Sequence, residues 1–409
     1  MEHLQELIAS TLKQIPRFVL ERRLDEKLRE AGIAVDTATL SKAAEHILSG
    51  SGETFELGKN ADDATIQITD DDIEHVVKMT DRFYTEQLGG FLDKAGDDVA
   101  NLLFESLSQK WPEEHEACQA DVEAFKARLE YRWGKALGKL RMLLAIVMEW
   151  ANERRRPANR KRHSHLQDVM LRLHVRPCQV TSEIIVLLEN GYADGAMARW
   201  RTLHEITIVA AVIAKFGEDI AERHVYYQIV ESFSALKAYE RNHKDLGFRL
   251  PSKTQSAKVR KDHANVLKRF GKQFGEEYGW AAYHLKGRVT FARLEEEAGD
   301  AMMRSPYKMA SYNVHASPKG VYFKLGSLKG SPVLLAGRSN AGLTEPAQYA
   351  AVSLAEITLL MIGDSAVFDD IVMGKIVARL EAEIPPELGK ADRKLRRDDR
   401  RHRKATQQP

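Results

Sequence analysis

Three polar side chains on one arc of an apolar helix are the residues of this sequence best suited to chemistry. In the stretch 191–216, Arg201, His204 and Glu205 fall within one arc at about 100° per residue, and apolar positions continue that arc. After Ile206 the stretch is apolar nearly all round, which is typical of a helix inside a bundle. Charged groups on a core-facing arc must be paired or functional, because an unpaired buried charge is costly.

Glu183 is the predicted partner of Arg201. An apolar helix over 178–190 precedes the central helix, and Gly191 supplies a short turn between the two. If they form an antiparallel hairpin, Glu183 and Arg201 lie at matching distances from the turn. We therefore expect these two side chains to sit side by side.

Proton transfer on a phosphodiester is one chemistry that this arc suggests. Arg199 and His204 have the spacing R-x4-H, which resembles the minimal pattern of the HEPN-type helical ribonucleases. The resemblance implies metal-independent RNA cleavage, in which histidine moves a proton while arginine stabilises charge growing on the phosphate. Arg199 lies about 140° around the helix from His204, so Arg201 is better aimed to cooperate with the histidine.

Tyr312 and His315 form a second candidate group, three residues apart on one face of a predicted helix that ends before Pro318. A histidine at this helix end could supply the second proton-transfer group that His204 lacks. The alternative is a tyrosine and a histidine that are hydrogen-bonded within the core or at a helix cap.

A metal site is another chemistry open to a helical bundle, but the Glu-x-x-His pair expected of di-iron bundles is missing from the central helices. We therefore expect no metal and no cofactor. The side chains that could offer nitrogen and oxygen ligands from facing helices are Glu183, His204, Glu205 and His315.

Two segments are strongly basic although the formal net charge is only +2, which excludes a protein-wide field that attracts nucleic acid. One interpretation of the segments 153–165 and 390–404 is a solvated helix end and a disordered tail. The other is contact with an RNA phosphate backbone. The candidate nucleic-acid-binding residues are Arg154, Arg155, Arg156, Arg160, Lys161, Arg162, Arg396, Arg397, Arg400 and Arg401.

The composition is that of an ordinary globular protein, with 409 residues, 44% apolar and 29% charged. No apolar run is long enough for a membrane span, and the first residues lack the apolar core of a signal peptide. The two cysteines, Cys118 and Cys178, form neither a disulfide framework nor a zinc motif. We expect a cytoplasmic protein with no membrane partner, and a homodimer stays open.

The predicted fold is mainly α, a multi-helix bundle with a small N-terminal α+β region and one short β-hairpin near 321–336. Alternating segments at 53–57 and 64–69 predict strands, and 344–384 reads as one long helix. The expected domains are an α+β region (1–96), a long connecting helix (97–159), a helical core (160–384) and a basic disordered tail (385–409).

The residues of the core also resemble a bacterial family, domain of unknown function 5677, over roughly 160–370. The resemblance rests on Glu183, the run 191–205, Gly279 with Trp280, and Tyr312 followed by His315 and Ser317. It implies an all-helical domain without an established activity. The residues that match the motif positions of the family are Glu183, Arg201, Glu205, Tyr312 and His315.

Three functions follow as hypotheses. The first is a nucleic-acid-associated effector with metal-independent ribonuclease activity in phage defence or toxicity, by analogy with the HEPN group. The second is a non-enzymatic helical scaffold or sensor with a buried Glu/Arg/His network. The third is a metal-dependent hydrolase or oxidase. A buried network and an active site use the same residue types, and solvent access separates them.

Overall fold

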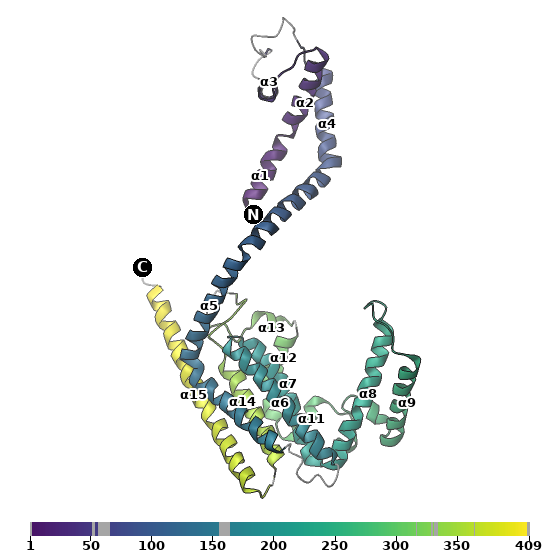
Figure 1. The fold of residues 1–409 in the computed structure, drawn as a ribbon, viewed down its shortest axis with the longest axis vertical. Coiled ribbons are helices and arrows are strands. Elements are labelled where there is room, and N and C mark those ends of the chain that lie inside the picture. The colour runs from purple at the N-terminus through teal and green to yellow at the C-terminus, as the bar shows by residue number, and fades with distance from the viewer. Residues whose placement is uncertain are drawn as a thin grey trace. The chain divides into compact units, whose positions relative to one another are not determined.

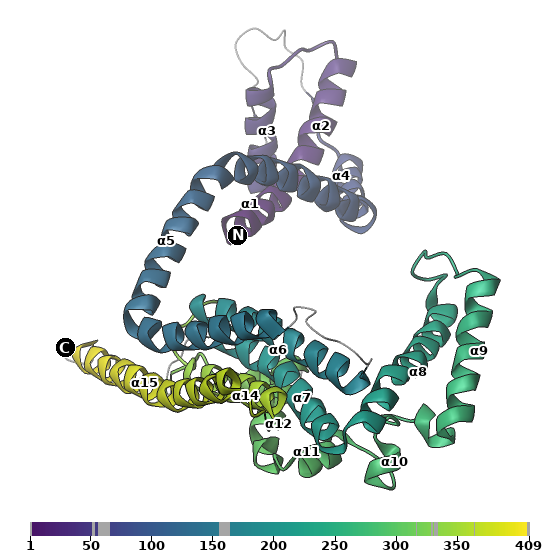
Figure 2. The same cartoon turned by 60° about the horizontal axis from the view of Figure 1, so that its bottom comes forward.

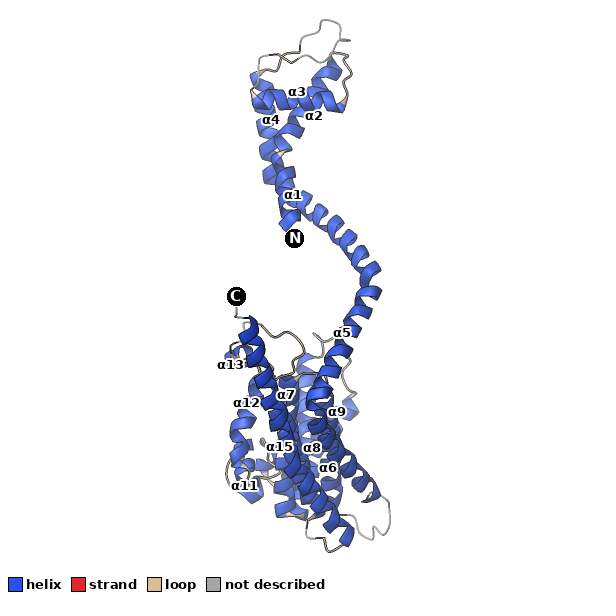
Figure 3. Ribbon diagram, turned by 90° about the vertical axis from the view of Figure 1, so that its left-hand side faces the viewer, coloured by secondary structure: helices blue, strands red, loops and turns tan. Residues whose placement is uncertain are grey.

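A computed structural model describes residues 2–50, 54–55, 66–154, 164–315, 317–328, 330, 334–363 and 365–406. The chain divides into two units, Met1–Cys118 and Gln119–Pro409. The helix α5 (Leu88–Arg154) contributes residues to both units. Over the described residues the secondary structure is helical, without a strand (Figure 3).

The predicted β-hairpin and N-terminal α+β region are therefore wrong for the residues that the structure describes. Residues 54–55 and 66–69 are irregular, and the rest of both predicted strands lies outside the described residues. Just before the predicted hairpin, Ser317 accepts a hydrogen bond from the amide of Gly320 at 3.2 Å and starts a short helix, α13 (Pro318–Tyr322). The serine cap followed by proline therefore makes residues 321 and 322 helical despite the apolar alternation, and residues 323–328 and 334–336 are irregular. Residues 331–333 lie outside the described part.

Unit 1 is built from short helices whose apolar faces meet in a small core. Its helices before α5 are α1 (Glu2–Lys13), α2 (Ile15–Glu30), α3 (Thr37–Ser49), α4 (Asp70–Arg82) and a single π-helical turn, η1 (Phe83–Gln87). The core residues are Leu20, Leu24, Leu28, Leu40, Ala43, Ala44 and Val76.

A buried carboxylate ties α4 to α2. Asp72 lies in a capping box with Thr69 and pairs with Arg23 at 3.0 Å and with Lys27. Burial alone would raise the pKa of Asp72, but hydrogen bonds from Lys27, Thr69 and Arg23 hold it well below its usual range. The interaction is a helix cap and an ion pair at once, so we assign it a structural role.

Unit 2 begins with the second part of α5 and continues through long and short helices. Its long helices are α6 (His165–Glu189), α7 (Ala193–Phe216), α8 (Glu218–Asn242), α9 (Lys253–Phe270), α14 (Thr344–Ile362) and α15 (Phe368–Thr406). Its short helices are η2 (Lys272–Gly275), α10 (Ala282–Leu285), α11 (Phe291–Ala298), η3 (Ala301–Met303), α12 (Arg304–Val314) and α13.

The helix α7 lies at the centre of this unit. It packs against α6, α14, α12 and α11, while α14 also packs against α15 (Figures 1 and 2). Trp200, Leu203 and Ile208 of α7 are fully buried, as expected for a helix that is apolar nearly all round. The helices α8 and α9 form a separate hairpin beyond the end of α7 (Figure 2).

The predicted helical hairpin through Gly191 is confirmed. Gly191 has a φ of +77°, a left-handed conformation that favours glycine. A Cβ atom at this position would lie 2.6 Å from the ring of Phe125 and 2.8 Å from the carbonyl oxygen of Ser339. The turn therefore needs glycine both for its backbone angle and for space, and it sets the alignment of α6 with α7.

Three expectations about helix boundaries change. Residues 97–154 of the helix predicted over 97–159 belong to α5, which begins at Leu88, and residues 155–159 lie outside the described part. The segment expected as one helix over 344–384 is broken at Gly363, whose φ of +54° ends α14. Residues 385–406 are helical in α15, so the expected disordered tail is wrong over these residues. In the described part of the chain, no helix has both the length and the apolar content needed to cross a bilayer.

Candidate functional site

The polar arc of α7 is centred on a fully buried histidine. His204 is 1% exposed, and its Nε2 lies 3.1 Å from Oε1 of Glu295, which is equally buried. Its Nδ1 lies 3.6 Å from Oδ2 of Asp300. The ring also packs against the aromatic rings of Trp200 and Tyr307. Both nitrogens of the imidazole thus face carboxylates, and the ring faces are covered by aromatic side chains.

The helix α11 brings Glu295 into the core. Thr290 caps this helix, and its apolar residues Phe291 and Leu294 face the interior. Glu295 follows Phe291 by four residues and so shares its face. Its second oxygen, Oε2, accepts a hydrogen bond from Nη1 of Arg304 at 2.5 Å. The buried carboxylate is therefore bound on both sides, by His204 and by a guanidinium.

Asp300 lies between α11 and η3, at the outer side of this pair. Burial raises the pKa of its carboxyl, the neighbouring Glu295 raises it further, and His204 lowers it in part. Together His204, Glu295, Asp300 and Arg304 form what we call the buried network. It links α7 to α11 and to the start of α12.

A second set of contacts continues from the buried network toward the surface. The hydroxyl of Tyr307 donates a hydrogen bond to Oε1 of Glu205 at 2.6 Å and accepts one from Nη2 of Arg201 at 2.9 Å. Arg201 and Glu205 also form an ion pair of 3.0 Å, one turn apart on α7. The guanidinium carbon of Arg201 lies 5.0 Å from the centre of the Tyr307 ring. These three side chains anchor α12 on α7.

The pKa values of this set follow from those contacts. Burial and the hydrogen bond to Glu205, which needs the neutral phenol, together raise the pKa of Tyr307 to about 12, although Arg201 lowers it in part. Burial opposes the charge of Arg201, but Tyr307 and Glu205 outweigh it and raise its pKa. Tyr307 is therefore a neutral hydrogen-bond donor, and Arg201 stays protonated.

The predicted pair of Glu183 and Arg201 is wrong. Glu183 on α6 binds Nε of Arg199, and both side chains are partly exposed. Arg201 points to the other side of α7, toward α12. The turn at Gly191 aligns α6 and α7 so that the residue two positions earlier meets Glu183.

This arrangement separates the two residues of the R-x4-H pattern. Arg199 binds Glu183 on α6, whereas His204 binds Glu295 on α11. Among the described contacts, none joins Arg199 to His204. The angular offset expected from the helix period therefore persists in the tertiary structure, because each side chain has a partner on its own side of α7.

Tyr312 and His315 lie beyond the part of α12 that meets the network. His315 follows the last residue of α12 and is exposed, and Tyr312 is half-buried with the ammonium of Lys319 5.0 Å from its ring centre. In the described part of the structure no contact joins either side chain to His204. From Tyr307 to His315 an α-helix advances about 12 Å, which accounts for the separation.

The candidate nucleic-acid-binding residues fall in two places. Arg154 is the last residue of α5, and the others of the first basic segment, Arg155, Arg156, Arg160, Lys161 and Arg162, lie outside the described residues. On α15, Arg396 pairs with Asp392 at 2.6 Å. The remaining candidates there are exposed, namely Arg397, Arg400 and Arg401.

The candidate metal ligands are not assembled. Glu183 binds Arg199, Glu205 binds Tyr307, and His315 is exposed away from both. Over the described residues, no three His, Cys, Asp or Glu side chains are placed to hold one metal ion.

Four residues of the site do not follow from the sequence patterns: Glu295, Asp300, Arg304 and Tyr307. One signal could have identified Glu295, since it lies on the apolar face of its helix, four residues after Phe291. The others lack such a signal, because their roles depend on how α11 and α12 dock on α7.

Part of the motif around Gly191 has a structural role. Asp194, in the first turn of α7, accepts hydrogen bonds from the amides of Leu325 at 3.0 Å and Gly326 at 3.5 Å. The carbonyl of Gly191 accepts one from the amide of Ser339 at 2.9 Å. These contacts hold the segment after α13 against the start of α7.

Comparison with known proteins finds a family model that matches part of this chain. Residues 167–331 match the model of a family described as a family of unknown function (DUF5677). The match confirms the resemblance seen in the motif, and it covers α7, α11 and α12 with the buried network between them. The chain has no match among curated proteins and none among solved structures.

Proposed function

We propose that this chain is a non-enzymatic helical scaffold or sensor, in which the buried network fixes how α11 and α12 pack on α7. One observation carries the proposal: His204 and Glu295 are each 1% exposed. A histidine enclosed in this way cannot reach an RNA phosphate unless α11 moves away. Catalytic histidines act by direct contact or through one water, which needs solvent access.

The chemistry of the network supports a structural role. Each carboxylate near His204 has a hydrogen-bonding or ionic partner. These interactions together offset the free-energy cost of burying the charges. Such a set tolerates few alternative packings, because any shift of α11 along α7 leaves a buried charge unpaired. Fixing the packing register is the best-attested use of buried polar groups.

The test compares stability with activity in the full chain. We expect His204→Gln to lower the free energy of unfolding by about 2–4 kcal/mol, because it leaves Glu295 without its buried partner. The wild-type protein is expected to leave single-stranded RNA intact in a gel assay without added metal. The matched control is His315→Ala, which changes an exposed histidine and should not alter stability.

The outcome that contradicts this proposal is specific. It is RNA cleavage by the wild-type chain that is lost in a His204→Gln protein with unchanged unfolding free energy. Such a result would assign His204 to catalysis.

The second candidate is the nucleic-acid-associated effector, with metal-independent ribonuclease activity as its finer form. The observation in its favour is the basic part of α15, where 390–404 holds nine lysines and arginines against three aspartates. Arg397, Arg400 and Arg401 are exposed there and available to phosphate oxygens. The exposed His315 is the accessible histidine of this hypothesis.

Binding to labelled single-stranded RNA at several salt concentrations tests this candidate. If α15 contacts the backbone, changing Arg397, Arg400 and Arg401 to glutamine should weaken binding and flatten its salt dependence. The control is Arg379→Gln, which removes an exposed arginine of the same helix outside the basic segment. Equal binding by both variants would remove the effector hypothesis.

A further inference from the structure

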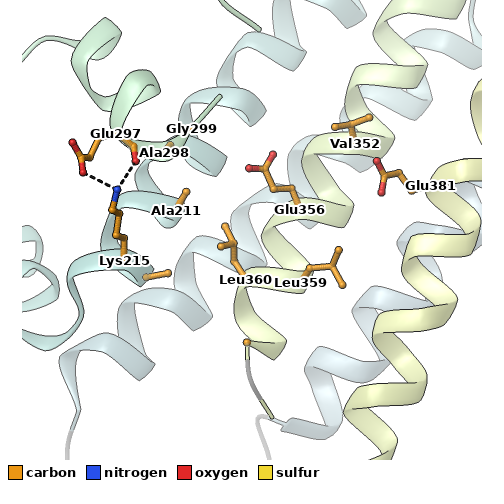
Figure 4. A pocket seen from close by; sticks show the side chains of 12 residues that line it. Ala211, Lys215, Glu297, Ala298, Gly299, Val352, Glu356, Leu359, Leu360 and Glu381 are labelled. Atoms are coloured by element: carbon orange, nitrogen blue, oxygen red, sulfur yellow. Dashed lines mark hydrogen bonds and ion pairs between the residues drawn. The ribbon is translucent and has the colours of Figure 1, made fainter. Parts of the chain in front are cut away.

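A hollow of about 970 Å³ lies between α7, α14 and α15 and opens to solvent (Figure 4). Its volume is in the range of small-molecule sites in proteins. It lies beside the buried network, since the loop after α11 forms part of its wall. The lining residues used below are Ala211, Lys215, Glu297, Leu360, Glu356 and Glu381.

Apolar side chains and two carboxyl groups line the hollow together. Ala211 from α7 and Leu360 from α14 are apolar lining residues. Glu356 lies one turn before Leu360 on the same face of α14, and Glu381 comes from the adjacent helix α15 (Figure 4). Within the described residues, no hydrogen bond or ion pair engages either carboxyl.

Lys215 also lines the hollow, but its ammonium group does not neutralise Glu356 or Glu381. Lys215 binds Glu297, with its Nζ 2.8 Å from Oε1 and 3.1 Å from the backbone carbonyl oxygen of that residue (Figure 4). Asp300, the outer member of the buried network, adds another negative charge close to Glu356. The hollow therefore has an excess of negative charge.

This excess affects the pKa of Glu356. Burial, with smaller contributions from the charges of Asp300 and Glu381, raises the pKa of its carboxyl to about 7. Burial also raises the pKa of Glu381. A cation between these groups would relieve the repulsion and replace the water that burial removes.

We propose that this hollow binds a small organic cation, with its ammonium group on the side of Glu356 and Glu381 and its hydrocarbon part against Ala211 and Leu360. The inference goes beyond the proposed function and does not depend on it. An anion would meet the same negative charge, and a neutral apolar ligand would leave both carboxyls desolvated without a partner. A bare metal ion would find no third protein ligand among the described side chains.

Calorimetric titration of the full chain at about pH 8 with three six-carbon probes tests the inference. The probes are hexylammonium, 1-hexanol and hexanoate, which share a hydrocarbon chain and differ in charge. We expect hexylammonium to bind at least about tenfold more tightly than 1-hexanol, because the free energy of a charge-assisted hydrogen bond corresponds to about that factor in affinity. Hexanoate should not bind, because its carboxylate meets the negative charge of the hollow.

Variants place the binding in the hollow. Glu356→Gln and Glu381→Gln should each weaken hexylammonium binding by about tenfold. The matched control is Glu383→Gln on the same helix, since Glu383 pairs with Lys139 and Arg379 outside the hollow. Its affinity for hexylammonium should equal that of the wild type.

Three results would overturn the inference. One is equal affinity for hexylammonium and 1-hexanol, which would indicate an apolar groove alone. Another is unchanged affinity after Glu356→Gln and Glu381→Gln are combined. The third is complete displacement of hexylammonium by magnesium chloride at matched ionic strength, which would indicate a metal site.

Discussion

Nε2 of His204 lies 3.1 Å from Oε1 of Glu295, and the two side chains are shielded from solvent together. They come from α7 and α11, which are separated by more than seventy residues of chain. The pair therefore joins two distant segments of the chain through a polar contact inside an apolar bundle. Its contribution to the free energy of unfolding can be measured.

The first prediction concerns that pair. Glu295→Leu should lower the free energy of unfolding by about 3–5 kcal/mol, because it leaves His204 buried with only Asp300 as a charged neighbour. Combining it with His204→Leu should recover part of that loss, since the buried imidazole is then removed with its carboxylate and only the less buried Arg304 and Asp300 lose a neighbour. Urea unfolding of the two single variants and the double variant gives the coupling. Glu296→Leu is the exposed control on the same helix, and a strictly additive double variant would contradict the pairing.

The second prediction concerns the anchor of α12. Tyr307→Phe removes the hydroxyl that joins Arg201 to Glu205, and should cost about 1–2 kcal/mol of unfolding free energy. The loss stays modest because Arg201 and Glu205 still form their own ion pair. Tyr322→Phe, at a position 90% exposed, is the control and should change stability by less than about 0.5 kcal/mol. Equal effects of the two substitutions would argue against the anchor.

The third prediction is a dependence on pH. The pKa of Glu356 rises from 4.5 to about 7 on folding, so the native state holds the proton more firmly than the unfolded state. Stability should therefore fall as the pH rises through that window. Glu356→Gln removes this loss and should stabilise the protein by about 1–2 kcal/mol at pH 8 and little at pH 4, after allowance for solvent screening. Thermal unfolding across this range checks the sign, and an equal effect at both pH values would refute it.

The fourth prediction compares two glycines with positive φ. Gly50→Ala, at a left-handed position (φ +64°, ψ +25°) with open space around it, should cost about 1 kcal/mol from the backbone alone. Gly191→Ala adds a collision with the Phe125 ring and the Ser339 carbonyl, and should cost at least about 2 kcal/mol more. Chemical unfolding measures both, and equal losses would mean that the Gly191 turn has room to relax.

The sequence predicted the helical class and the hairpin at Gly191 correctly, because both depend on local signals. Helical periodicity over 193–216 places Arg201, His204 and Glu205 on one arc, and a helix period needs no information from elsewhere in the chain. The errors in predicted secondary structure also come from local signals, which were weighed wrongly. At 318–322 a serine cap and a proline outweighed an alternating pattern, and at Gly363 a single glycine ended a helix whose apolar pattern continues.

The amino-acid sequence alone determined that polar groups on α7 would face the interior and so would need partners. Only the tertiary structure decided which partners they have: Arg199 for Glu183, Tyr307 for Arg201, and Glu295 for His204. The physical reason is that periodicity sets the angle of a side chain around its own helix. The neighbour at that angle depends on the relative shift and rotation of packed helices, which the apolar cores and the Gly191 turn set together.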